Sequence, residues 1–521
     1  MEFIRKEEYT VKPNEKILSL INALIRVGSV VVVLLLEIGL ILVGVVMLHR
    51  SAMGVYLLLQ VFSVPLIYFM VNKEPRYKLN WVLIIFLLPG GGFLLYFLWG
   101  SKREFSWFNR AFRRAEQEII ESVPIRSDVE QRCYASYPNE APIGRYLARA
   151  GYPVFENEGV RFFNCGAAMY ESLIPDLKAA KKSIHIETFI LDKGEIWDEI
   201  FEILKQKVAE GVEVCMVLDD FGCLKASTPS FRKEVRQAGI RLTFFAPINK
   251  DILHVSFNFR THQKYLLIDE KIGYCGGINL ADEYFDRKER FGYWKDSATR
   301  IEGEAVRSME AMFLVMWQVC TKERKKLSPL PPREASQAEA FVRPFDGGPA
   351  KNPDNPVQAL YDMVIARAAE HLYITTPYLV LDRQMTANLI RAAQSGVDVR
   401  IMMPGIYDKG YVHAVSRHNF GPLLRHGIRI FEYTPGFLHA KELVTDGNLA
   451  ICGSVNLDFR SLWEHYECGV LFTGGQIVKD IAEDIAQIQA DSREITYEEW
   501  KHRSVFQKIT ECVLNLLAPL M

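Results

Sequence analysis

Two short segments carry the same reactive residue types at the same spacing. They read THQKYLLIDEKIGYCGGINLAD and FLHAKELVTDGNLAICGSVNLD, and each contains the pattern HxKxxxxD. The pattern is formed by His262, Lys264 and Asp269 in the first segment and by His439, Lys441 and Asp446 in the second. Both continue into a strand-like run, two small residues and an asparagine. Because one such match is weak evidence and a second with the same continuation is not expected by chance, we interpret the two segments as parts of one site.

These residue types suit chemistry on a phosphodiester. Residues two apart in a strand point to one side, so each histidine is expected to project beside its lysine. The lysines, together with Asn279 and Asn456, can bind non-bridging oxygens and stabilise a five-coordinate transition state. One neutral histidine can attack phosphorus while the other, protonated, gives its proton to the departing alkoxide. We therefore predict no metal and no cofactor, and expect the small pairs 276–277 and 453–454 to let backbone approach the phosphate.

The aspartates of the two motifs belong to the candidate catalytic set, yet their neighbours favour a structural role. Asp446 is followed by Gly447 between two apolar runs, which predicts a hairpin turn, and Asp269 begins DEKIG at the matching place. Both are predicted to fix the turn and the strand register. A catalytic histidine also needs an acid to orient it, and the candidates are Asp296 and Glu467, each in the strand-like run after a motif.

The composition is that of a folded protein with an apolar surplus. The chain has 521 residues, a net charge of -1 and 49% hydrophobic residues, so no nucleic-acid partner is predicted. Its nine cysteines form no CxxC pair, and Cys215, Cys275 and Cys452 lie in apolar runs, which indicates reduced core residues and a cytoplasmic catalytic portion. The histidines outside the motifs, including His465, have no repeated context and are interpreted as core or surface residues.

The apolar surplus lies in the first hundred residues. Three apolar runs cover residues 27–48, 55–71 and 81–100, and the first two are long enough to span a bilayer as helices. The sequence PGGG at 89–92 divides the third run into halves that are each too short to cross alone. If the flanking basic segments stay cytoplasmic, the first two runs form a hairpin and the third is re-entrant or interfacial. Three full spans with a kink remain an equal alternative.

The rest of the chain alternates strand and helix patterns, and their order repeats. SIHIETFILD (183–192) corresponds to HLYITTPYLVLD (371–382), and QAGIRLTFF (237–245) corresponds to RHGIRIFEY (425–433). We predict an α/β fold of two copies of one unit with pseudo-two-fold symmetry, preceded by an N-terminal transmembrane helical region. The predicted parts are a membrane region (1–100), a basic connector (101–155), a first repeat (156–322), a linker (323–343), a second repeat (344–485) and a C-terminal helical tail (486–521). The tail is either a surface amphipathic helix or a core-packed one.

The paired motifs, with their GGIN and GSVN tails, resemble the phospholipase D superfamily over residues 156–485. FNFRTHQKYLLID, WKDSATRIEGEAV, GSVNLDFRS and NKEPRYKLNW resemble bacterial cardiolipin synthases over nearly the whole chain. The resemblance implies phospholipase D-like repeats and a two-step transfer. One phosphatidylglycerol phosphatidylates a histidine with loss of glycerol, and a hydroxyl of a second phosphatidylglycerol then attacks to give cardiolipin. Family usage implies that His262 is the nucleophile and His439 the acid and base, although the symmetry of the motifs also allows the reverse.

The resemblance further implies a multi-pass protein of the bacterial cytoplasmic membrane whose partners are phosphatidylglycerol and cardiolipin. Another phosphatidyl transferase or a phospholipid hydrolase of the same chemistry is the nearest alternative. A nuclease is disfavoured by the neutral net charge. An inactive membrane scaffold is disfavoured because both motifs are intact. The sequence does not determine the oligomeric state.

Overall fold

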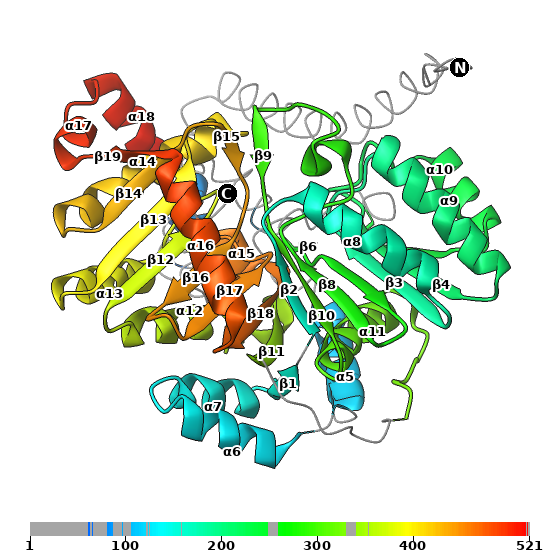
Figure 1. Cartoon of the computed structure of the whole chain (residues 1–521). Helices are drawn as coiled ribbons and strands as arrows, with labels where there is room; N and C mark the ends of the chain where they lie inside the picture. Colours follow the sequence, from blue (N-terminus) through cyan, green and yellow to red (C-terminus); the bar gives the residue numbers. More distant parts are fainter. Residues whose placement is uncertain are drawn as a thin grey trace, which may run out of the picture.

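The structure is a computed structural model in which two α/β units lie side by side (Figure 1). It describes residues 61, 62, 65, 81–86, 96, 106–120, 123, 125–157, 159–247, 259–329, 340–352, 354–516 and 518. The predicted membrane region 1–100 therefore lies almost wholly outside the described residues. Within the described ranges, no helix combines the length and the apolar character that a bilayer span requires.

The first unit is built on a seven-stranded sheet with the order β2-β10-β8-β7-β3-β4-β5. Strands β3, β4 and β5 are parallel, and β7, β8, β10 and β2 continue the sheet in antiparallel fashion. The strands are β2 (Gly159–Phe163), β3 (Ser183–Thr188), β4 (Glu213–Asp219), β5 (Arg241–Phe245), β7 (Tyr265–Ile268), β8 (Ile272–Gly276) and β10 (Ala298–Glu302). The helices are α8 (Gly166–Ala179), α9 (Glu195–Ala209), α10 (Pro229–Gln237) and α11 (Val306–Thr321).

Strand β4 shows why the central strands of the sheet are continuous apolar runs in the sequence. Val214, Met216 and Leu218 pack in the core formed with α8, α9 and α10, whereas Cys215 and Val217 pack in the core that contains α11. Successive side chains of a strand point to opposite faces, and both faces of this sheet are covered. The central positions of the strand, residues 214–218, are therefore all apolar.

The second unit is built on a ten-stranded sheet with the order β1-β11-β18-β17-β16-β12-β13-β14-β19, and β6 pairs with β18. The strands are β1 (Phe155–Asn157), β6 (Arg260–Thr261), β11 (Ala340–Gly347), β12 (His371–Thr375), β13 (Asp398–Pro404), β14 (Arg429–Tyr433), β16 (Glu442–Thr445), β17 (Leu449–Gly453), β18 (His465–Thr473) and β19 (Ser492–Ile495). The helices are α12 (Pro356–Arg367), α13 (Arg383–Gln394), α14 (Gly410–Arg425), α15 (Phe459–Trp463) and α16 (Gln476–Ala490).

The two sheets repeat one strand order. The parallel strands β3-β4-β5 correspond to β12-β13-β14, and the antiparallel strands β7-β8-β10 correspond to β16-β17-β18. The prediction of a duplicated α/β unit is therefore confirmed. Strand β2, antiparallel to β10, likewise corresponds to β11, antiparallel to β18, so the second sheet differs by its extra strands β1, β6 and β19.

The segments outside the repeats have more structure than predicted. The predicted connector 101–155 contains α5 (Ser106–Ile120), α6 (Ser127–Ser136) and α7 (Ala141–Arg149). Helix α5 packs against α11 because Phe108 and Phe112 are buried. Strand β11 begins inside the predicted linker 323–343. The predicted helical tail 486–521 contains β19 as well as α17 (Tyr497–Lys501) and α18 (Val505–Leu516).

Two short strand pairs join the units. Strand β6 of the first half pairs with β18 of the second, placing Arg260 opposite His465 and Thr261 opposite Tyr466. Strand β15 (Gly436–Leu438) pairs with β9 (Tyr293–Lys295) of the first half. Figure 1 shows β9 and β15 between the two sheets. Each half thus lends a short strand to the other immediately before its histidine.

The aspartates of the motifs occupy tight turns at the far ends of β7 and β16. The carboxylate of Asp446 accepts the backbone N–H groups of Ala369, Glu370 and His371 at 2.8 to 3.0 Å, and its φ is 52°. Asp269, with φ of 57°, accepts three N–H groups of residues 181–183 in the same way. A short polar side chain tolerates this left-handed conformation. The prediction that Asp446 shapes a hairpin turn is confirmed by the β16–β17 pairing.

We expect Asp446→Ala to lower the free energy of unfolding by about 1 to 2 kcal/mol, because three backbone donors lose their acceptor. Asp446→Asn, which keeps one carbonyl acceptor and tolerates the positive φ, is the matched control and should lose less. Denaturant unfolding of the purified protein measures both. Unchanged stability together with lost activity would contradict a structural role for Asp446.

Candidate active site

Each histidine–lysine pair lies between two strands. Residues 262–264 connect β6 to β7, and residues 439–441 connect β15 to β16. The prediction that each pair sits within one strand is therefore wrong. The physical reason is that each segment leaves its own sheet to reach the other half: the backbone N–H of His262 donates to the carbonyl of Tyr466 at 2.8 Å, and that of His439 donates to the carbonyl of Lys295 at 2.7 Å.

The orienting acids are exchanged between the halves. His262 Nδ1 lies 2.9 Å from Glu467 Oε2, across 205 residues of sequence. His439 Nδ1 lies 2.7 Å from Asp296 Oδ2, across 143 residues. A carboxylate at Nδ1 favours the tautomer in which Nδ1 carries the proton and Nε2 is a free base. In both histidines Nε2 is therefore the atom available for chemistry.

The two lysines share the environment of the two histidines. His262, Lys264, His439 and Lys441 are all buried. Lys264 Nζ donates to the carbonyl of His262 at 2.7 Å, and Lys441 Nζ makes the same contact with the carbonyl of His439. The charge of Lys441 acts on His262 and that of Lys264 acts on His439. The residues of the two motifs thus form one electrostatic unit.

Burial dominates the protonation of this unit. It lowers the pKa of His262 well below its usual value, and Lys264 and Lys441 lower that pKa further. Burial and the charge of Lys441 lower the pKa of His439 to about 4, although Asp296 opposes them. Burial also lowers the pKa of Lys441 to about 7. The lowered pKa values favour the neutral form of both histidines at pH 7.

The asparagines that follow the two motifs are buried. Asn279 Oδ1 accepts the backbone N–H of Ile190 at 3.0 Å, and its buried Nδ2 has no partner among the described residues. Asn456 is also buried, and its Oδ1 is unpaired within the same ranges. The free amide donor of Asn279 is available to a phosphoryl oxygen.

The small residues after each motif make room for the acids. A Cβ added at Gly277 would lie 2.1 Å from Asp296 Oδ1, so only glycine fits beside this carboxylate. In the second half, the hydroxyl of Ser454 donates to Glu467 Oε2 and thereby helps to hold it. Gly277 and Ser454 thus seat the orienting acids, and the approach of backbone to the phosphate at these pairs stays a prediction.

Asp296 and Glu467, predicted as orienting acids, thus contact the histidines, whereas the structure does not bring Asp269 and Asp446 to them. Sequence reasoning missed His465, which was interpreted as a core or surface residue. Its Nδ1 lies 3.7 Å from Glu467 Oε1, and its ring centroid lies 5.7 Å from that of His262. The only sequence signal for a place of His465 near the catalytic histidine is its position two residues before Glu467.

Within the described residues, two groups of side chains have the composition of a cation site, and neither favours a cation. His262, His465 and Glu467 have ligand atoms within 4.8 Å of one another. The positive charges of Lys264 and Lys441, which lower the pKa of His262, also oppose a metal ion there. His185, Glu213 and Cys215 form the other group, in which Lys325 Nζ is 2.6 Å from Glu213 and occupies its carboxylate.

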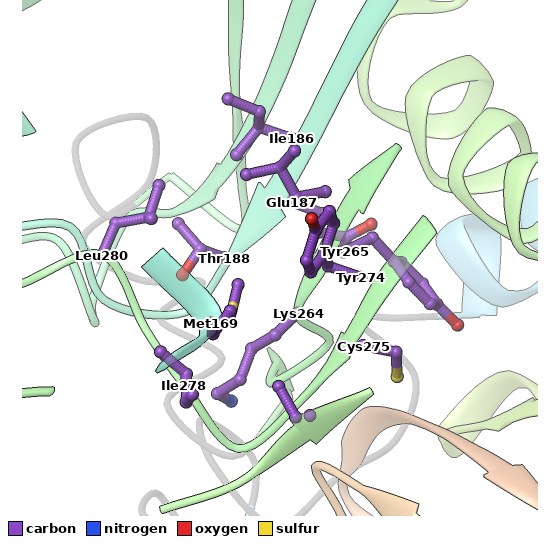
Figure 2. A pocket seen from close by; sticks show the side chains of 13 residues that line it. Met169, Ile186, Glu187, Thr188, Lys264, Tyr265, Tyr274, Cys275, Ile278 and Leu280 are labelled. Atoms are coloured by element: carbon purple, nitrogen blue, oxygen red, sulfur yellow. The ribbon is translucent and has the colours of Figure 1, made fainter. Parts of the chain in front are cut away.

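A small cavity lies behind Lys264 inside the first unit. Figure 2 shows the lysine stem beside Met169, Thr188, Ile278 and Leu280 on its wall. Its volume is about 20 Å³, enough for one water molecule and too small for a lipid headgroup. The side chains that line the cavity contact the lysine stem, and the cavity is not a substrate site.

Comparison with known proteins agrees with this geometry. The family model for the cardiolipin synthase, phospholipase D-like domain matches residues 173–317 and 361–489, which is more than half of the chain. The chain belongs to this family. A model named phospholipase D-nuclease N-terminal matches residues 58–101. The resemblance noted in the sequence is thereby confirmed.

Individual relatives of this cardiolipin synthase family cover most of the chain. A protein of Streptococcus mutans is 36% identical over 85% of this chain and 96% of its own length. A cardiolipin synthase of Geobacillus kaustophilus is 31% identical over 88% of this chain and 92% of its own. The crystal structure of a phosphatidylserine synthase of Haemophilus influenzae covers 73% of this chain and 98% of its own, with a TM-score of 0.56 at 15% identity. That structure shows the same fold.

The low pKa of Lys441 predicts a pH-dependent anion affinity. Below pH 7 its ammonium is charged and attracts an anion; above pH 7 it loses the proton, and affinity falls. Sulfate keeps its charge throughout this range, so its Kd should rise by about tenfold between pH 6 and pH 8, as one linked proton requires. Calorimetric titration of the solubilised protein with sulfate at each pH measures this Kd.

Lys441→Arg is the matched variant, because guanidinium stays charged over this range. Its sulfate affinity should vary much less with pH. An equal pH dependence in Lys441→Arg and in the unmodified protein would contradict the assignment to Lys441.

Proposed function

We propose that the protein is a cardiolipin synthase, which transfers a phosphatidyl group from one phosphatidylglycerol to another and releases glycerol. The observation that carries this proposal is the pair of crossed contacts, His262 with Glu467 and His439 with Asp296. Because each carboxylate binds Nδ1, the Nε2 atoms of both imidazoles remain free to react. Together with the two lysines they can act on one phosphodiester. Curated cardiolipin synthases that align with about nine-tenths of the chain support it.

In the first step, Nε2 of one neutral histidine attacks the phosphorus of phosphatidylglycerol. The bond from phosphorus to the glycerol oxygen breaks, and the protonated second histidine gives its proton to that oxygen. Lys264, Lys441 and the Nδ2 of Asn279 stabilise the charge on the non-bridging oxygens. The products are glycerol and a phosphatidyl-histidine.

In the second step, a hydroxyl of another phosphatidylglycerol attacks the phosphatidyl-histidine. The second histidine, now neutral, takes the proton of this hydroxyl, and the phosphorus–nitrogen bond breaks. Cardiolipin leaves, and both histidines return to their initial protonation states. The reaction needs no redox change, and no step is assigned to a metal ion.

We assign the nucleophile to His262 and the acid and base to His439. The two lysines reinforce the effect of burial on His262, which keeps its Nε2 unprotonated. Asp296 opposes that effect at His439 and stabilises its imidazolium. An anionic phosphodiester bound between the lysines raises the pKa of His439 further, because it adds negative charge beside it. The bound phosphodiester thereby favours the charged form of this acid.

Purified protein incubated with labelled phosphatidylglycerol should produce cardiolipin and glycerol. Phosphatidic acid as the sole product would instead indicate the alternative function, a phospholipid hydrolase. A phosphatidyl ester of another added alcohol, formed in preference to cardiolipin, would indicate a different phosphatidyl transferase. Absence of every product would contradict the enzymatic proposal.

His262→Ala and His439→Ala should each lower turnover by at least about a thousandfold, because each removes a group that makes or breaks a bond. Peptide mapping at neutral to alkaline pH after a rapid quench, conditions that preserve the acid-labile phosphorus–nitrogen bond, should find the label on His262. Label on His439 would reverse the assignment while keeping the mechanism. His502→Ala is the matched control, because His502 is exposed at the end of α17, and it should retain most activity.

We further propose that the N-terminal region anchors the protein as a multi-pass protein in the bacterial cytoplasmic membrane. The apolar runs 27–48 and 55–71 are the proposed spans, and 81–100 is the proposed re-entrant hairpin. The match of residues 58–101 to the phospholipase D-nuclease N-terminal model supports a conserved role for this segment. The catalytic units then face the cytoplasm.

Single cysteines at Arg50 and Lys102 test this topology. In intact cells an impermeant thiol reagent should label Arg50→Cys and leave Lys102→Cys unlabelled until the membrane is opened. Labelling of both from outside would contradict the re-entrant arrangement and favour three full spans.

A further inference from the structure

Helix α18 turns its apolar side away from the protein. Val505, Phe506, Ile509 and Val513 are exposed to 71%, 78%, 58% and 53%, and Cys512 is exposed as well. These positions recur at spacings of one, three and four residues, which places them on one face of the helix. Such a continuous exposed apolar stripe is unusual for a protein surface in contact with water.

The inward side of α18 is more polar than the outward side. Glu511 is buried there and forms an ion pair with Arg503 at 3.2 Å. Among the described residues, Leu514 of the helix and Ala518 beyond it add apolar contacts, in a small cluster with Val380, Val412 and Val415. A helix at a water-facing surface buries its apolar face against the protein. In α18 the apolar face points away from the protein, and this orientation requires an apolar environment on that side.

The position of α18 relates it to the active site. It packs along α14, and Ala518 reaches Val380, whose backbone N–H donates to the carbonyl of Leu457 at 2.9 Å, next to Asn456. Tyr407 and Tyr411, at the start of α14, are 46% and 50% exposed. In Figure 1, α18 lies at the opposite end of the molecule from α6 and α7.

We propose that α18 lies in the interface of an anionic phospholipid bilayer, with its apolar stripe among the acyl chains. The exposed Lys508 and the two tyrosines fit this occupant, because ammonium and phenol groups remain at headgroup level while their apolar parts insert. A second copy of the chain would not call for a lysine beside the stripe. The inference rests on the proposed function, since a lipid substrate requires the site to meet a bilayer.

Cys512 supplies a probe on the stripe itself. The other described cysteines are buried or half-buried, and replacing the half-buried Cys165 and Cys320 by alanine leaves Cys512 as the accessible thiol. An environment-sensitive fluorophore on Cys512 of the full chain is measured in vesicles of phosphatidylglycerol and phosphatidylcholine. We expect emission at shorter wavelength and several-fold stronger quenching by brominated acyl chains than by aqueous iodide. Stronger quenching by iodide would overturn the proposal.

The double substitution Phe506→Asp with Ile509→Asp should reduce the quenching by brominated chains at least about threefold. Ile125→Asp is the control, since Ile125 is 67% exposed and precedes α6 directly. It should leave the quenching unchanged. Cys512–Cys512 cross-linking between chains, without quenching by lipid, would overturn the proposal in favour of a second copy. If lipid quenches the probe in a protein that makes no cardiolipin, the proposed function is contradicted and the proposed bilayer contact is supported.

Discussion

The exchange of partners between the two halves is the interaction on which the site depends. Each histidine has its backbone N–H bound by a carbonyl of the other half and its imidazole bound by a carboxylate of the other half. Separating the halves would take from Glu467 and from Asp296 the histidine that each one binds. The pairs β6–β18 and β9–β15 therefore hold the catalytic groups as well as the two units.

The resulting site is built from equal motifs but has unequal sides. His465 stands beside His262, whereas Trp294 stands beside His439 at a centroid separation of 5.5 Å. Both residues lie two positions before an orienting acid. An imidazole on one side and an indole on the other give the two histidines different electrostatic surroundings. This difference suits a reaction in which one histidine forms a bond to phosphorus and the other moves protons.

The charge of the site also fits an anionic substrate. Two buried lysines and two imidazoles face two carboxylates, and burial keeps the imidazoles neutral and draws Lys441 towards neutrality. A phosphodiester adds the missing negative charge and favours the charged form of Lys441 and of one histidine. Binding therefore favours the protonated histidine that the first step needs.

The sequence by itself determined the reactive residue types, the duplicated strand order and the turn at Asp446, because these follow from local spacing, hydropathy and backbone conformation. It also singled out Asp296 and Glu467. Only the tertiary structure decided that each acid serves the histidine of the other half, since those contacts join residues 143 and 205 positions apart. Local patterns carry no information on such pairing. The tertiary structure also decided two further points for the same reason. Gly277 leaves space for the Asp296 carboxylate, and His465 lies beside His262, and both follow from the packing of the chain and not from local sequence.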